Sequence, residues 1–193
     1  MSTGLYGGSF DPPHRGHVEL VRHAKAELGL DRLLVLVSVD PGHKDVETPV
    51  DIRLELVRAA FPDDDVMLDP HPRTVDTLRA HPEWVDPIFL IGADQFCDFP
   101  TWKEPNQVLE LTRLGVATRP GFPRDKLDSV LATLDHPERV RFFAMPPVPV
   151  SSSDVRARVA AGEDVGGDVP EAVAELIRAR RLYLRPAGYT GRA

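Results

Sequence analysis

Two histidines that follow a pair of glycines give this sequence its clearest chemical signal. His14 and His17 are separated by two residues and come shortly after Gly7 and Gly8. Apolar residues recur at helical spacing from Val18 onward, so the histidines fall where a buried strand turns into a helix. Glycines let a backbone approach a ligand, helix N-termini attract anions, and imidazole donates hydrogen bonds to phosphate oxygens. The pattern favours a polyphosphate site, although such a histidine pair in isolation also fits capping, packing or zinc binding.

A second pattern suited to anions lies near the carboxyl end of the sequence. Ser151–Ser153 precede Arg156 at the expected start of a helix. Serine hydroxyls and backbone N–H groups there can hold phosphate oxygens, while an arginine neutralises their charge. Serines before a helix more commonly act only as caps. Because both patterns are expected at helix N-termini after buried strands, a nucleoside triphosphate could bridge them.

Strand-like and helix-like segments alternate along the sequence as far as residue 144. The strand-like runs are mostly apolar throughout, as in strands that are buried on both faces. This alternation predicts an α/β, Rossmann-like fold with a mostly parallel sheet flanked by helices, and ligands are expected at the carboxyl ends of its strands. Strands are expected at residues 3–6, 33–38, 66–68, 88–91, 114–118 and 140–144, and helices at about 16–28, 51–60, 75–81, 106–111 and 124–134.

The pattern changes after residue 144, where a proline-rich segment leads into the serines. The serines begin a helix that is expected to continue until Gly162. Asp168 is then expected to cap a final helix that has Pro170 in its first turn. We therefore expect a single domain over residues 1–193, with residues 151–193 forming a small helical C-terminal portion.

The composition is that of an ordinary globular protein, with 42% hydrophobic and 27% charged residues in 193. A formal net charge of −7 argues against a general nucleic-acid surface. The longest apolar run, Leu33–Val37, is too short to span a membrane, and no signal peptide is visible, so a cytoplasmic location is expected. Cys97 is the only cysteine and cannot form an intramolecular disulfide. The oligomeric state is left open.

The histidine and serine patterns together resemble those of bacterial nicotinate-nucleotide adenylyltransferases, which belong to a larger nucleotidyltransferase superfamily. The resemblance spans nearly the whole chain and implies one nucleotidyltransferase domain. His14–His17 corresponds to the HxGH motif of that superfamily, and Val150–Arg156 corresponds to its serine-rich motif ending in arginine. Further similar segments are Pro41–Lys44 (the PxHK loop), Thr74–Leu78 (TxDTL), Ile91–Asp94 (GAD) and Pro100–Trp102 (PTW).

The resemblance implies adenylyl transfer in NAD biosynthesis. The phosphate of nicotinate mononucleotide would attack the α-phosphorus of ATP in line, which gives nicotinate adenine dinucleotide and pyrophosphate without a covalent enzyme intermediate. Orientation and charge neutralisation would supply most of the catalysis, with His17 at the α-phosphate and His14 at the neighbouring phosphates. Mg²⁺ would travel mainly on the ATP phosphates, without a metal site in the chain. The resemblance thus assigns catalysis to His14, His17 and Arg156, and ATP binding to these three with Gly7, Gly8, Ser9, Phe10, Ser152 and Ser153.

The same resemblance assigns acceptor binding to Lys44, Thr74, Asp94 and Trp102. Each of them also has a simpler interpretation. Lys44 could be a solvated loop lysine, Thr74 a helix cap, and Trp102 a core residue rather than a stacking partner for the pyridine ring. Asp94 could cap the next segment, hydrogen-bond a ribose or position the acceptor.

The segment before Thr74 departs from the family pattern. Many members have a longer segment with a Ser-Tyr pair, whereas this sequence has Asp69–Arg73. Arg73 could compensate by pairing with a carboxylate, or it could simply lie on the surface. The HxGH motif alone does not define the acceptor, so adenylyl or cytidylyl transfer to another acceptor, such as nicotinamide mononucleotide or phosphopantetheine, is the enzymatic alternative. A nucleotide-binding module without turnover is the non-enzymatic one. Trp102 argues against phosphopantetheine, and the intact histidines argue against the module.

Overall fold

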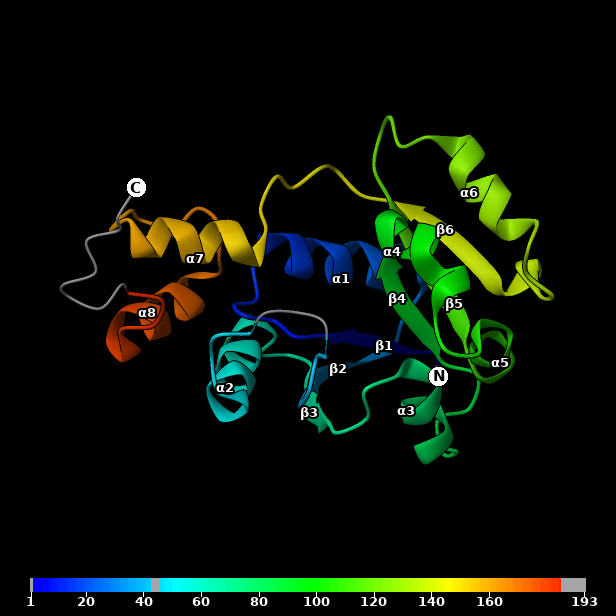
Figure 1. The fold of residues 1–193 in the computed structure, drawn as a ribbon, viewed down its shortest axis with the longest axis horizontal. Coiled ribbons are helices and arrows are strands. Elements are labelled where there is room, and N and C mark those ends of the chain that lie inside the picture. The colour runs from blue at the N-terminus through cyan, green and yellow to red at the C-terminus, as the bar shows by residue number, and fades with distance from the viewer. Residues whose placement is uncertain (1, 43–45, 185–193) are drawn as a thin grey trace.

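The structure is a computed structural model that describes residues 2–42 and 46–184 (Figure 1). Within these residues, six parallel strands form one sheet in the order β3-β2-β1-β4-β5-β6. The α/β, Rossmann-like prediction is therefore confirmed. The strands are β1 (Thr3–Gly8), β2 (Arg32–Ser38), β3 (Asp65–Asp69), β4 (Ile88–Gly92), β5 (Arg113–Thr118) and β6 (Val140–Ala144).

Helices flank the sheet, and each predicted helix is present in the described residues. The segments Ala93–Asp98 and Phe99–Thr101 were not predicted, because they are short and too few of their residues repeat at helical spacing to reveal a stripe. The predicted helix over 124–134 is shorter than expected and ends at Leu131. The helices are α1 (Arg15–Leu28), α2 (Val50–Ala60), α3 (Thr74–Ala80), α4 (Ala93–Asp98), α5 (Pro105–Leu111), α6 (Arg124–Leu131), α7 (Ser152–Ala160) and α8 (Glu171–Arg180), with 3-10 turns at Phe99–Thr101 and Pro137–Arg139.

The central strands are apolar throughout because hydrophobic cores cover both faces of the sheet. In β2, Leu33, Val35 and Val37 belong to one core, to which α1, α2, α7 and α8 contribute. Leu34 and Leu36 belong to the other core, to which α3, α4, α5 and α6 contribute. Successive side chains of a strand point to opposite faces, so one continuous apolar run supplies both cores. None of these five side chains is more than 5% exposed.

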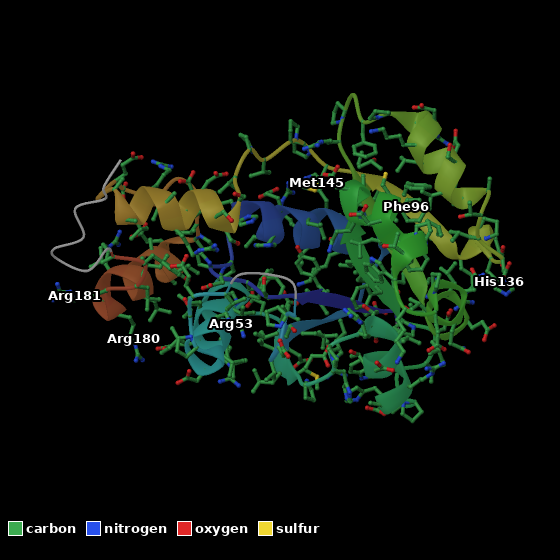
Figure 2. The ribbon with its side chains drawn as sticks, in the orientation of Figure 1. Arg53, Phe96, His136, Met145, Arg180 and Arg181 are labelled. Atoms are coloured by element: carbon green, nitrogen blue, oxygen red, sulfur yellow. The ribbon has the colours of Figure 1, made fainter. Side chains whose placement is uncertain are left out.

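The helix α8 joins the sheet through α2. Figure 1 shows α8 beside α2, and Arg180 of α8 donates a 2.9 Å hydrogen bond to Glu55 of α2 (Figure 2). One predicted detail is wrong: Pro170 occupies the N-cap position of α8 rather than its first turn, and Asp168 does not cap that helix. The Asp168 carboxylate instead pairs with Arg158, whose guanidinium group is the stronger partner.

The order of the strands fixes where a ligand should bind. From β1 the chain proceeds outward through β2 to β3, and it then returns to β4 and proceeds outward through β5 to β6. The winding therefore reverses between β1 and β4. In open parallel sheets, the crevice outside the carboxyl ends of the strands at such a reversal is the usual ligand site. No helix in residues 2–42 and 46–184 has the length and apolarity needed to cross a membrane.

Candidate functional site

Two cavities adjoin at the carboxyl end of β1. The first, of about 480 Å³, contains both histidines and is called the histidine cavity below. The second, of about 840 Å³, contains Trp102 and is called the tryptophan cavity. Gly7, Gly8, Ser9 and Gln95 line both cavities, so the strand end and the start of α4 form a shared wall.

The histidine cavity collects every residue that the sequence assigned to ATP binding. These residues come from two segments about 140 positions apart, the turn between β1 and α1 and the start of α7. The lining also includes Tyr6, Asp11 and Gln95, to which the sequence analysis gave no role. The nine predicted residues in the lining are Gly7, Gly8, Ser9, Phe10, His14, His17, Ser152, Ser153 and Arg156.

Aromatic rings leave little room for a side chain at Gly8 in the turn and at Gly16 in the first turn of α1. A Cβ on Gly8 would lie 2.9 Å from the ring of Phe10, and a Cβ on Gly16 would lie 3.0 Å from the ring of His14. Phe10 has a positive φ of 49° and is only 2% exposed, and its ring meets that of His17 edge-on with centroids 5.1 Å apart. Phe10 thus supports the histidine from the core side.

The two histidines are oriented by the backbone at the start of α1. His14 is the N-cap residue, and its N–H donates a 3.0 Å hydrogen bond to Nδ1 of His17. In the other direction, Nδ1 of His14 faces the N–H of His17, as in a capping box. The two atoms do not form a second hydrogen bond. Because Nδ1 of His17 accepts this hydrogen bond, it carries no proton, and the proton of the neutral ring is on Nε2. The rings stack with centroids 3.6 Å apart.

Burial keeps His14 uncharged near neutral pH. It lowers the pKa of His14 to about 4, against the opposing effect of the nearby Asp154 carboxylate. His14 can therefore donate a hydrogen bond to an anion as a neutral imidazole, and the positive charge of the cavity comes from Arg156.

The serines at the start of α7 have separate roles. Ser151 is the N-cap, since its hydroxyl accepts a 3.1 Å hydrogen bond from the N–H of Asp154. Ser152 donates a 2.9 Å hydrogen bond to the carbonyl of Pro12, which ties α7 to the β1–α1 turn. Ser153 is exposed and lines the histidine cavity. The capping interpretation therefore holds for Ser151, whereas Ser152 and Ser153 lie at the cavity.

Arg156 is held in the cavity by two neighbouring segments. Its Nη1 donates a 2.8 Å hydrogen bond to the carbonyl of Asp11, and its Nε donates a 3.0 Å hydrogen bond to the carboxylate of Glu47. The side chain of Arg156 is 14% exposed, whereas that of Glu47 is 59% exposed. An ion pair with one such exposed partner is weak, so a phosphate group can compete for the guanidinium.

A second arginine, Arg53 of α2, holds the loops that carry the site. It is 2% exposed and lies between α2 and the carboxyl end of β2 (Figure 2). It donates hydrogen bonds of 2.8 Å to the carbonyls of Ser9 and Ser38 and one of 3.1 Å to that of Thr48. Burial lowers the pKa of Arg53, and the Asp11 carboxylate partly opposes this. Arg53 was not predicted from the sequence, although a charged residue among the apolar positions of a helix is a possible signal.

The tryptophan cavity combines an aromatic wall with a polar one. Trp102 is half-buried and meets the rings of Phe99 and Phe89 edge-on, at centroid distances of 5.3 and 6.4 Å. Thr74, the first residue of α3, lines the same cavity. Thr77 points its hydroxyl to Asp69 with a 2.8 Å hydrogen bond. The structure therefore places at one cavity Thr74 and Trp102, two of the residues that the resemblance assigns to acceptor binding.

The segment before Thr74 contributes basic side chains to the tryptophan cavity. His71 and Arg73 both line it, together with Lys103. Lys103 is paired with Asp76 at 2.9 Å, whereas exposed Arg73 forms no ion pair with a carboxylate of the described residues. The residues that depart from the family pattern thus place at this cavity a guanidinium that no carboxylate of the described residues neutralises.

Asp94 and Lys44 do not join this group. The Asp94 side chain is 78% exposed, lies 3.6 Å from Arg119, and lines a separate hollow with Arg119 and Lys126. Asp94 sits in the first turn of α4, immediately after β4, and this turn directs it toward the loop after β5 rather than toward Trp102. Lys44 lies outside the described residues.

The histidines and carboxylates of residues 2–42 and 46–184 do not gather into a metal site. No group of three His, Cys, Asp or Glu side chains in this part of the chain is placed to hold a metal ion. Gln95, which the sequence analysis also missed, accepts a 3.2 Å hydrogen bond from the N–H of Gly92 and carries no signal beyond its place after Asp94.

Comparison with known proteins identifies relatives of this chain. The cytidylyltransferase-like family model matches residues 5–158. A Thermomicrobium roseum protein named "Probable nicotinate-nucleotide adenylyltransferase" is 37% identical over 194 residues, which cover 93% of this chain and 90% of the relative. A protein of the same name from Thermus thermophilus is 37% identical over 196 residues, which cover 95% of this chain and 100% of the relative.

A solved structure has a similar fold. The Plasmodium falciparum nicotinic acid mononucleotide adenylyltransferase complexed with NaAD aligns with a TM-score of 0.76 over 94% of this chain and 97% of that chain. The sequence identity is 20%, so this likeness concerns the fold alone.

Proposed function

Because this chain belongs to the nicotinate-nucleotide adenylyltransferases of the cytidylyltransferase-like family, we propose that its two adjoining cavities divide the two substrates between them. The enzyme joins ATP and nicotinate mononucleotide to give nicotinate adenine dinucleotide and pyrophosphate, a step of NAD biosynthesis. ATP binds in the histidine cavity, and the acceptor binds in the tryptophan cavity. The observation that carries this division is that the two predicted phosphate motifs line one cavity, which shares a wall with the aromatic one.

The donor side suits phosphoryl chemistry that needs no covalent intermediate. The capping geometry directs Nε2 of His17 away from the helix backbone, which suits it to hydrogen-bond the α-phosphate of ATP. His14 and Ser153 would contact the neighbouring phosphates, and Arg156 would neutralise the departing pyrophosphate. The acceptor phosphate would attack the α-phosphorus in line across Gly7–Ser9. Charge that develops at the α-phosphate would be met by donors that are already oriented.

The acceptor side suits a planar, anionic ring. Trp102 offers an aromatic face to the pyridine ring, and Thr74 lies at the same cavity. Arg73 would form paired hydrogen bonds with the nicotinate carboxylate, which nicotinamide lacks. Lys44 remains a sequence-based proposal for a phosphate contact. Asp94 is left out of the acceptor site because its carboxylate faces Arg119 instead.

Mg²⁺ is proposed to enter with ATP, bound mainly to the phosphates. The residues that the structure describes contain no group of three side chains that could hold a metal ion. An ion that is bound by the ATP phosphates needs no such group. When bound, Mg²⁺ neutralises charge on the phosphates and the leaving pyrophosphate. We further propose that the chain works as a single domain in the cytoplasm, where ATP is available.

A pyrophosphate-release assay tests the proposed function. Wild-type protein is incubated with Mg²⁺ and ATP, and with nicotinate mononucleotide, nicotinamide mononucleotide or phosphopantetheine in turn. We expect the fastest release, with formation of nicotinate adenine dinucleotide, when nicotinate mononucleotide is the acceptor. The proposal is wrong if nicotinate mononucleotide is inert. Binding of ATP without release with any acceptor would indicate a nucleotide-binding module.

A further inference from the structure

We propose that Tyr183, which lies shortly after α8, is a positioning residue for the phosphate-binding half of the active site and acts through Asp11. The proposal rests on the function proposed above for the histidine cavity. The two residues are 172 positions apart, and the hydroxyl of Tyr183 donates a 2.7 Å hydrogen bond to Oδ1 of Asp11.

Two residues of the segment that follows α8 have left-handed backbone conformations, and Arg181 among them is the C-cap of that helix. Arg181 and Tyr183 have positive φ values of 54° and 60°, in the left-handed region that residues other than glycine rarely adopt. The Tyr183 ring packs against the core that includes α2 and α8. Burial raises the pKa of Tyr183 far above its usual value, so the phenol remains a hydrogen-bond donor at any working pH. Core packing thus holds Tyr183 in a rarely adopted backbone conformation, from which its hydroxyl group reaches Asp11.

Asp11 is a buried carboxylate that depends on such donors. It is 2% exposed, and its Oδ2 accepts a 2.7 Å hydrogen bond from the N–H of Glu47 and a longer one, of 3.4 Å, from the N–H of Thr48. Tyr183 supplies the hydrogen bond to Oδ1. A buried carboxylate without its donors is strongly destabilised, so the loss of one donor favours a rearrangement of the group.

The backbone around Asp11 orients the residues proposed to hold the triphosphate. The carbonyl of Asp11 accepts a hydrogen bond from Arg156, and the carbonyl of Pro12 accepts one from Ser152. Glu47, whose N–H is held by the Asp11 carboxylate, contacts Arg156 through its side chain. Asp11 therefore fixes Arg156 from two sides, once through its own carbonyl and once through Glu47.

These contacts belong to one cavity only. Asp11 and Arg156 line the histidine cavity, and neither of them lines the tryptophan cavity. A disturbance of the contact between Tyr183 and Asp11 should therefore weaken the use of ATP and spare the binding of the acceptor. A purely structural role would not separate the two substrates in this way.

The test compares Tyr183→Phe with wild type by steady-state kinetics, varying ATP and nicotinate mononucleotide separately. We expect kcat/KM for ATP to fall about tenfold, as expected when a charged acceptor loses a hydrogen bond. The KM for nicotinate mononucleotide should stay within about twofold of wild type, because its cavity keeps all of its contacts.

Thr112→Val is the matched control. Its buried hydroxyl donates a 2.8 Å hydrogen bond to the carbonyl of Pro87, at the amino end of β5 and away from both cavities. This variant also loses one buried hydroxyl, so it should lower Tm and leave both substrates' parameters unchanged. If Tyr183→Phe does not fold, Asp11→Asn replaces it with the same expected selectivity for ATP.

Three results would overturn the proposal: wild-type ATP parameters in folded Tyr183→Phe, an equal loss for both substrates, or the same ATP-specific loss in Thr112→Val. These outcomes are separate from a failure of the proposed function. If wild-type protein makes no nicotinate adenine dinucleotide, the proposed function is wrong. If wild type makes it and Tyr183→Phe matches wild type, only the role of Tyr183 is wrong.

Discussion

The histidine cavity and the tryptophan cavity share a wall but are built in different ways. The histidine cavity is held by side chains that reach backbone carbonyls far away in the sequence, such as Ser152 to Pro12 and Arg156 to Asp11. The tryptophan cavity is lined by an aromatic cluster and by the short segment that ends in Arg73. The first arrangement fixes charged groups for chemistry at phosphorus, and the second offers a surface that can select an acceptor. Changes in the first cavity should therefore alter turnover, and changes in the second should alter the choice and affinity of the acceptor.

The largest expected effect is that of His17→Ala. The loss of its Nε2 donor should lower kcat by about 100-fold or more, as expected for one donor to a charged transition state. Circular dichroism should show an intact fold, and the KM for nicotinate mononucleotide should change little. Unchanged turnover in a folded variant would show that His17 has no part in the reaction. It would also contradict the assignment of phosphate chemistry to the histidine cavity.

Arg73→Gln tests whether the tryptophan cavity selects nicotinate over nicotinamide mononucleotide. The ratio of kcat/KM for nicotinate to that for nicotinamide mononucleotide should fall about tenfold, because the loss of a charge-assisted hydrogen bond affects only the carboxylate. Arg79→Gln is the matched control, since Arg79 lies in α3 and is already paired with Glu104. If the ratio is the same in wild type and both variants, Arg73 does not recognise the carboxylate.

Trp102→Ala should affect binding of the acceptor more than binding of ATP. We expect the KM for nicotinate mononucleotide to rise about fivefold, the effect of losing an aromatic contact, while the KM for ATP stays near its wild-type value. The measurement is a pair of saturation curves at a fixed, saturating level of the other substrate. A larger rise for ATP would place the adenine rather than the pyridine ring near Trp102.

His14 should make the free energy of unfolding depend on pH below neutrality. Its titration should not change kcat near pH 7, because the imidazole is already neutral there. Its pKa is about 4 in the folded protein against a usual value near 6.5, so the unfolded chain binds more protons between these pH values. The contribution of neutral His14 to stability is present above about pH 6.5 and is lost as the pH falls toward 4. Denaturant unfolding of His14→Gln should therefore depend less on pH in this window, by on the order of 2 kcal/mol. An identical pH dependence in both proteins would contradict the burial of a neutral imidazole.

The two cavities also differ in how far the sequence predicted them. The β1–α1 turn and the start of α7 are local structures, so short runs such as His14–His17 and Ser151–Arg156 specify both the backbone and the side chains that it presents. All nine residues assigned to ATP therefore line one cavity. The four central strands were equally predictable, because apolar runs buried on both faces have few alternatives.

The tryptophan cavity depends on how loops meet in three dimensions, which short motifs do not encode. Asp94 was assigned to the acceptor, but the short helix α4 that starts just before it turns it toward Arg119. Asp11 and Arg53 were missed because their partners are backbone groups of distant segments. Tyr183 was missed for the same reason, since nothing near it in the sequence points to Asp11.

The division of substrates between the two cavities is tested most directly by a crystal structure of this chain with nicotinate adenine dinucleotide. We expect the adenylyl phosphate within hydrogen-bond distance of His17, the diphosphate linkage over Gly7–Ser9, and the pyridine ring against Trp102 with its carboxylate at Arg73. A dinucleotide bound in the reverse direction, or a pyridine ring outside the tryptophan cavity, would contradict the account.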